Sequence, residues 1–97
     1  MNNKRKDLVH VTDVVADEYK RKSYLDLVAL TARPDVFEME YEGRTYDFEI
    51  EAKQADANTV YVSVGSQRHR LFTVGYAIYF GKTKSGDLIE ESKDVIF

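Results

Sequence analysis

Apolar and acidic residues alternate between Val36 and Ala52, and this is the clearest pattern in the chain. Side chains of a β-strand point alternately to the two faces of a sheet, so a period of two predicts strands with one buried face. The alternation is interrupted at Glu42-Gly43, where glycine can adopt the positive φ of a tight turn. The segment therefore predicts a β-hairpin with aromatic residues on one face and carboxylates on the other.

Two loop lengths keep the aromatic residues of this hairpin on one face. A two-residue loop pairs Phe37 with Phe48, and a four-residue loop pairs Met39 with Phe48. A three-residue loop is excluded, because it would turn the aromatic side chains to opposite faces. Both allowed registers set carboxylates opposite carboxylates, which costs about 0.2–1 kcal/mol per pair. We therefore expect the aromatic face to be buried, since burial of a large apolar side chain contributes roughly 1.5–3 kcal/mol.

Residues 8–33 instead carry apolar residues at a period of 3.6, which is typical of a helix with one buried face. Thr12 or Asp13 is a candidate N-cap, and Pro34 should end the helix because the residue before a proline resists helical dihedral angles. The expected apolar stripe consists of Val11, Val14, Val15, Leu25, Ala29 and Ala32.

A basic run at residues 20–22 interrupts this stripe. Ser23, followed by Asp26, resembles the start of a second helix with its own capping residue. We expect one helix of about twenty residues within the segment 8–33, and two shorter helices broken near Ser23 are the alternative. Residues 1–7, which contain three consecutive basic residues, are expected to form a flexible basic tail.

Later segments alternate in the same way as the hairpin. Residues 59–64 and 71–80 predict a third and a fourth strand, with valine and aromatic residues on the inner face. Residues 88–97 predict a short fifth strand or a tail. The connections between these segments are expected at residues 54–58, 65–70 and 81–87.

Consecutive strands joined by short loops form an antiparallel meander. The inward aromatic and valine side chains of this meander need a cover, and the N-terminal helix is the only candidate. The sequence therefore predicts a single α+β domain over residues 1–97. Its N-terminal helix would pack on one face of a four- to five-stranded antiparallel β-meander.

Composition places the chain among ordinary globular domains. It has 97 residues, of which 43% are hydrophobic and 32% are charged, and this length suits one domain. There is no cysteine, which suits a cytoplasmic location and excludes disulfide and thiolate chemistry. No apolar run is long enough to cross a membrane, so no membrane association is expected.

The charges are unevenly distributed along the chain. The net charge is −3, but residues 36–52 alone carry −5, so the acidity is local. The short link at Pro34-Asp35 should bring the helix N-terminus to the same end of the sheet as the Gly43 turn and the 65–70 loop. We call the basic residues expected there the cationic rim: Lys4, Arg5, Lys6, Arg44, Arg68, His69 and Arg70.

The outer side of the hairpin should carry a cluster of carboxylates, which we call the acidic face: Glu38, Glu40, Asp47, Glu49 and Glu51. Tyr61 and Tyr79 are expected beside it on the third and fourth strands. Carboxylates on an open, solvated sheet face lack the pocket that tuned acid–base chemistry requires.

Catalytic and metal-binding patterns are weak in this sequence. The only histidines are His10 and His69, which limits nucleophile–base pairs. His10, Asp13 and Asp17 lie at helical spacing, but they lack a fourth ligand and are better explained as an exposed helix face. We therefore expect no enzyme activity, no cofactor and no metal site.

Three classes of function remain. The favoured hypothesis is a non-enzymatic protein-binding or inhibitor-type module whose acidic face docks on a partner protein with a basic surface. The first alternative is nucleic-acid binding, in which the cationic rim contacts phosphates and a tyrosine stacks on a base, although the net charge opposes it. The second alternative is a small-ligand cup, and a homodimer through the outer sheet face is compatible with each hypothesis. The cup would lie among Tyr24, Tyr41, Tyr46 and Tyr76.

Overall fold

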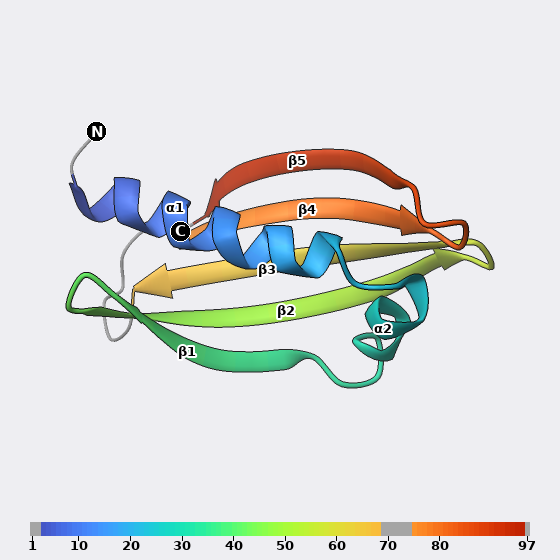
Figure 1. Cartoon of the computed structure of the whole chain (residues 1–97), viewed down its shortest axis with the longest axis horizontal. Helices are drawn as coiled ribbons and strands as arrows, with labels where there is room; N and C mark the ends of the chain where they lie inside the picture. Colours follow the sequence, from blue (N-terminus) through green and yellow to red (C-terminus); the bar gives the residue numbers. More distant parts are fainter. Residues whose placement is uncertain (1–2, 69–74, 97) are drawn as a thin grey trace.

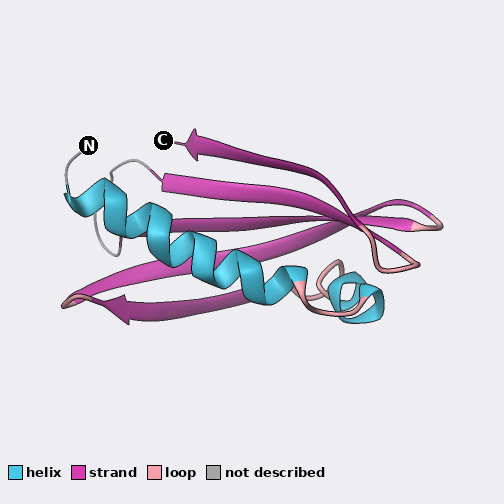
Figure 2. Cartoon of the chain, turned by 45° about the horizontal axis from the view of Figure 1, so that its top comes forward, coloured by secondary structure: helices cyan, strands magenta, loops and turns pink. Residues whose placement is uncertain are grey.

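The computed structural model describes residues 3–68 and 75–96. Within these residues, five strands form one antiparallel sheet in sequential order, and two helices lie on one of its faces (Figures 1 and 2). This confirms the predicted α+β fold, with a fifth strand in place of a tail. The elements are α1 (Asn3–Lys20), α2 (Tyr24–Ala29), β1 (Asp35–Tyr41), β2 (Arg44–Asp56), β3 (Thr59–Arg68), β4 (Gly75–Thr83) and β5 (Leu88–Ile96).

The hairpin of β1 and β2 has the register of the two-residue loop. Phe37 lies opposite Phe48, and their rings stack with centroids 5.2 Å apart. Glu42 and Gly43 form the turn with φ values of 52° and 74°. Two consecutive positive φ values define the turn type whose twist matches that of the flanking strands. The four-residue alternative is therefore wrong, and the turn geometry fixes which side chains face the helices.

The strands extend further than the sequence pattern indicates. Residues 65–68, expected in a loop, belong to β3 and pair with residues 46–49 of β2. Likewise β2 runs to Asp56 and β4 to Thr83, through segments that we expected to be turns. Pairing with a neighbouring strand satisfies the backbone N–H and C=O groups whatever the side chains are. A strand can therefore continue through polar residues, and the hydrophobic pattern then underestimates its length. The expected start of the fourth strand, at 71–74, lies outside the described residues.

The expectation of one continuous helix is wrong, and the alternative break near Ser23 is confirmed. Ser23 is extended, with ψ 159°, and its side chain accepts a hydrogen bond from the Asp26 amide at 3.1 Å. It therefore caps α2, as serine commonly does at a helix start. The end of α1 is capped from elsewhere in the fold, because the Lys82 ammonium on β4 donates to the carbonyls of Lys20 and Lys22 at 2.7 and 2.6 Å.

The start and the end of the helical region also differ from expectation. Helix α1 begins at Asn3, so neither Thr12 nor Asp13 is its N-cap, and residues 3–7 are helical where a tail was expected. Helix α2 ends at Ala29. Turns with hydrogen bonds between residues three positions apart connect it to the segment before Pro34. Proline therefore marks the link to β1 and does not itself end a helix.

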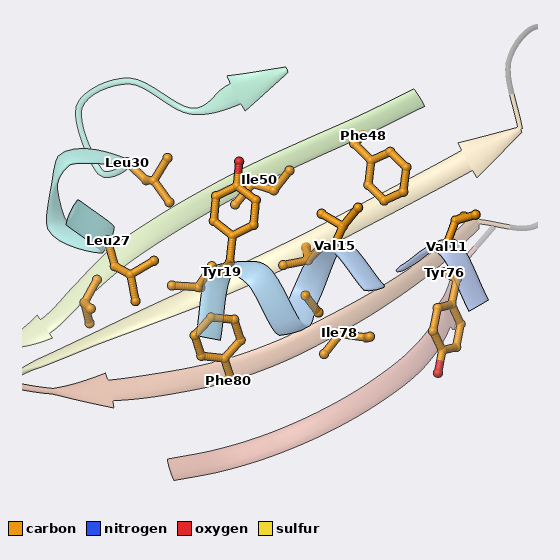
Figure 3. Packing of buried hydrophobic residues seen from close by; sticks show 14 of the residues in the cluster. Val11, Val15, Tyr19, Leu27, Leu30, Phe48, Ile50, Tyr76, Ile78 and Phe80 are labelled. Atoms are coloured by element: carbon orange, nitrogen blue, oxygen red, sulfur yellow. The ribbon is translucent and has the colours of Figure 1, made fainter. Parts of the chain in front are cut away.

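The core lies between the helices and the inner face of the sheet (Figure 3). Val11 and Val15 are buried as expected, but Val14 is 44% and Leu25 is 74% exposed. The break between the helices changes the helical phase, so the predicted stripe fails after residue 20, at Leu25, Ala29 and Ala32. Val14 lies before the break, on the exposed side of α1. The helix residues that contribute instead are Leu8, Ala16, Tyr19, Tyr24, Leu27 and Leu30.

A buried pair of hydroxyl groups ties α1 to β3. The Thr12 hydroxyl donates to the Leu8 carbonyl at 2.6 Å and lies 2.5 Å from the Ser66 hydroxyl. The Ser66 hydroxyl therefore donates to Thr12, and it also lies 3.2 Å from the Tyr76 carbonyl on β4. Because buried polar groups are costly unless paired, this chain of bonds fixes the position of the helix along the sheet.

Tyr46 offers a test of the core. Its side chain is fully buried, and its hydroxyl has no hydrogen-bond partner among the described residues. A buried unsatisfied hydroxyl costs about 1–3 kcal/mol, so Tyr46→Phe should raise the free energy of unfolding by about 1 kcal/mol. Tyr19→Phe is the control, because the Tyr19 hydroxyl donates to Asp35 at 2.5 Å and its loss should destabilise. Urea unfolding measures both, and a clear loss of stability in Tyr46→Phe would contradict the expectation.

Candidate functional site

The face of the sheet opposite the helices carries the acidic face. Glu38 and Glu40 project from β1, and Glu49 and Glu51 from β2, and all four are exposed. Asp47, also on β2, is half-buried. Tyr46, Phe48 and Ile50, which alternate with these residues, are buried under the helices. The structure thus places the five predicted residues on one side of two adjacent strands.

The pairing of β1 with β2 brings the carboxylates close together. Glu38 lies directly opposite Asp47. Glu49 and Glu51 are successive outward residues of β2, and the neighbouring Glu51 raises the pKa of Glu49, chiefly through a hydrogen bond between the two carboxyl groups and also through its charge. Carboxylates gathered in this way attract cations.

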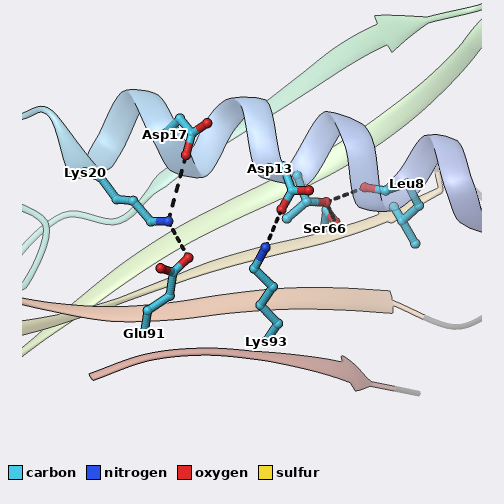
Figure 4. A network of polar contacts seen from close by, with 8 residues as sticks. Leu8, Asp13, Asp17, Lys20, Ser66, Glu91 and Lys93 are labelled. Atoms are coloured by element: carbon cyan, nitrogen blue, oxygen red, sulfur yellow. Dashed lines mark hydrogen bonds and ion pairs between the residues drawn. The ribbon is translucent and has the colours of Figure 1, made fainter. Parts of the chain in front are cut away.

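Carboxylates on the helix side of the molecule are arranged differently (Figure 4). Asp13 accepts a hydrogen bond from Lys93 of β5 at 3.2 Å, which raises the pKa of Lys93. Lys20 bonds to Glu91 of β5 and lowers its pKa, and it lies 3.8 Å from Asp17. The pairs Asp13–Lys93 and Lys20–Glu91 join α1 to β5.

Two shallow hollows lie on the outer face. The first, of about 340 Å³, is lined by Asp47 and Glu49 and by Gly65 and Gly75, which contribute no side chain. A glycine at an outward strand position leaves such a gap, and this is a signal that our sequence analysis missed. Its other lining residues are Val36, Phe48, Ser66 and Gln67.

The second hollow, of about 290 Å³, includes both predicted tyrosines. Tyr61 and Tyr79 line it together with Glu51 and Lys53. The Tyr61 hydroxyl donates to Glu90 of β5, and this bond is the main cause of a raised pKa for Tyr61. Tyr61 is therefore held in place, whereas Tyr79 is 37% exposed. Aromatic and acidic side chains border the same depression.

The expected cationic rim is described only in part. Arg44 lies at the expected end of the sheet, beside the start of α1, because the Arg44 guanidinium donates to Asp7 of α1 at 2.9 Å. That ion pair partly neutralises Arg44, so it is less available to a phosphate than a solvated cation. Lys6 is exposed on α1. The side chains of Lys4, Arg5 and Arg68, and all of His69 and Arg70, lie outside the described parts of the chain.

The tyrosines expected to form a ligand cup serve other roles. Tyr46 and Tyr76 belong to the hydrophobic core. Tyr24 is also in the core and accepts a hydrogen bond from Gln54 at 2.5 Å. Tyr41 is half-buried, with its ring 5.3 Å from that of His10. The two hollows described above are lined by other residues, on the opposite face of the sheet.

The helical set of His10, Asp13 and Asp17 is engaged elsewhere. His10 lies against Tyr41, and the two aspartates pair with lysines. In the parts of the chain that the structure describes, no cluster of three or more metal-ligating side chains is found.

No protein-family model matches this chain, and searches of curated proteins and of solved structures give no significant match. The protein is therefore classified by its fold alone, as an α+β domain with helices on one face of an antiparallel meander. Within residues 3–68 and 75–96, neither helix combines the length and the apolar character needed to cross a membrane.

Proposed function

We propose that this protein is a non-enzymatic binding module that docks the acidic face on a basic surface of a partner protein. The observation that carries the proposal is the gathering of five carboxylates on one side of β1 and β2, where Glu38 lies opposite Asp47 and Glu49 and Glu51 are successive outward residues. On the helix side of the sheet, Asp13 of α1 and Glu91 of β5 each pair with a lysine. The positive charges of a basic partner are attracted by all the carboxylates of the acidic face, and they offset the repulsion between those carboxylates.

The hollows add contact area to this attraction. Lysine and arginine side chains have long apolar stems, which can pack on exposed apolar surface while their charged heads reach carboxylates. Val36, 73% exposed, and the tyrosines of the second hollow supply such surface. Tyrosine faces also attract cations by about 0.5–1 kcal/mol at exposed sites. The acidic face is therefore suited to arginine- and lysine-rich surfaces.

A test compares two charge reversals of equal size. Glu49→Lys with Glu51→Lys reverses the acidic face, and Glu18→Lys with Asp26→Lys reverses exposed acids of α1 and α2. Partners are captured from a cell lysate with the unchanged protein, and their Kd is measured by titration. The first variant should bind at least about tenfold more weakly, because a close like-charge contact costs several kcal/mol. The second should bind as the unchanged protein does.

Salt provides an independent measurement on the same complex. Exposed charges separated by more than the Debye length, about 8 Å at physiological ionic strength, are screened, so affinity should fall steeply as salt is added. Equal capture of one partner by both variants, with no dependence on salt, would refute docking through the acidic face.

A further inference from the structure

Strand β1 forms one edge of the described sheet, with its other side open (Figure 1). In a hairpin with a two-residue loop, the residues that flank the turn exchange both hydrogen bonds, and such bonded pairs alternate along the strands. Tyr41, Met39 and Phe37 therefore bond to β2. The backbone N–H and C=O groups of Val36, Glu38 and Glu40 point away from β2, along the open edge.

The inner side of β1 is less covered than that of its neighbours. Helix α1 packs chiefly on β3 and β4, and α2 on β2 and β3. Phe37 and Met39 are consequently half-buried, whereas Phe48 and Tyr46, opposite them on β2, are 1% and 0% exposed. Apolar side chains of a neighbouring strand would complete the burial of this row.

The two edges of the sheet are protected to different degrees. Pairing of β5 is interrupted by a bulge beside Glu90, which has a φ of 52°, and side chains of β5 are tied to α1. Strand β1 pairs without interruption over seven residues and contains no proline. Bulges and prolines are common devices that prevent an edge from pairing with another chain, and β1 lacks both.

We propose that β1 binds an extended segment of the basic partner, which adds to the sheet as an antiparallel strand. This rests on the proposed function and specifies how the partner is held. Side chains of the added strand alternate between the faces, so those opposite Glu38 and Glu40 meet carboxylates and those between meet Phe37 and Met39. The segment recognised has lysine or arginine at alternate positions, separated by apolar residues.

A second copy of this chain fits the edge less well. Two β1 strands paired with each other would place Glu38 and Glu40 against the same carboxylates of the copy. Like charges directly opposite each other destabilise a strand pair. Charge complementarity thus selects a basic segment as the occupant, and self-association is measured as a separate outcome by light scattering.

The first test uses a short peptide in which lysine and valine alternate, added to the full chain. Amide hydrogen exchange is followed by NMR. The amides of Val36 and Glu40 should exchange rapidly in the free protein, because their N–H groups point away from β2, and should become protected when the peptide is bound. The amides of Phe37 and Met39 should be protected in both states. Binding without new protection would overturn the added strand and leave docking on the acidic face intact.

N-methylated peptides sharpen this test. The backbone groups of Glu38 and Glu40 point toward the open edge of β1. The peptide residues directly opposite them in an antiparallel pair therefore exchange hydrogen bonds with them, so lysines at these positions direct their backbone N–H groups toward β1. Methylation of the lysine nitrogens should therefore abolish binding, whereas methylation of the valine nitrogens should have little effect. Equal binding of both peptides would indicate attraction of charge alone and would overturn the proposal, as would absence of binding by the unmodified peptide. Docking on the acidic face is judged independently by the Glu49 and Glu51 reversal.

A substitution in the protein gives a matched control. Val36→Pro removes one outward N–H without a change of charge and without loss of a bond to β2, and proline is tolerated at such edge positions. Val36→Thr keeps the N–H and the shape of the side chain. The Kd for the alternating peptide should be roughly three- to tenfold higher in Val36→Pro than in Val36→Thr, because only the proline variant lacks the N–H. Equal Kd values in the two variants would contradict backbone pairing at this edge.

Discussion

Replacement of Lys82 by methionine should lower the free energy of unfolding by about 2 kcal/mol. Lys82 is only 8% exposed, and its ammonium donates to the carbonyls of Lys20 and Lys22 at the end of α1. Helix ends have carbonyls without partners in the helix, and a cation there also interacts favourably with the helix dipole. Methionine keeps the unbranched stem but removes the charge, so these contacts are lost.

The expected loss is smaller than the sum of two charged hydrogen bonds, because the variant no longer buries an ammonium group. Thermal unfolding should detect it, since 1 kcal/mol corresponds to a shift in Tm of about 4–8 °C for a domain of this size. Lys84→Met is the control, because Lys84 is exposed two residues further along the chain. Equal melting of the two variants would show that Lys82 is not the cap on which the end of α1 depends.

Substitution of Gly81 by alanine should destabilise the fold by about 1–3 kcal/mol, the typical cost of overpacking. A Cβ atom at this position would lie 2.8 Å from a side-chain carbon of Ile89 and 2.8 Å from the ring of Tyr61. Tyr61 cannot move away freely, because its hydroxyl bonds to Glu90. The clash should therefore displace either β5 or the tyrosine, and denaturant unfolding measures the cost.

Gly65→Ala is the matched control for this substitution. Its Cβ would meet only the Glu49 carbonyl, at the ordinary contact distance of 3.5 Å. Since glycine weakens a strand interior, alanine at position 65 should be neutral or slightly stabilising. A similar loss of stability in both variants would indicate a general intolerance of side chains on the outer face, in contradiction to the specific contact at Gly81.

The hairpin could be predicted from sequence because its determinants are local. The alternation through Phe37 and Phe48 sets the faces, and Gly43 allows the turn that fixes the register. The position of the acidic face follows from the same alternation, because a residue between two buried ones must point outward. The five residues of the acidic face accordingly lie together on the outer side of β1 and β2.

Other features depend on contacts that no local pattern contains. The end of α1 is capped by Lys82, sixty residues further along the chain, so the sequence near Ser23 could not decide between one helix and two. The first hollow is lined by Gly65 of β3 and Gly75 of β4, which are separated in sequence. The incomplete cover over the inner side of β1 likewise depends on where the helices lie over the sheet. Such features require the assembled fold.

The order of the elements has a consequence for biosynthesis. Helix α1 leaves the ribosome first, yet the strands that it contacts most, β3 and β4, and the lysine of β5 that bonds to Asp13 follow much later. The apolar face of α1 therefore has no strands to pack against until β3 and β4 have been synthesised. A chaperone that shields short amphipathic segments should crosslink to nascent chains halted before β3 and release them once β5 has emerged.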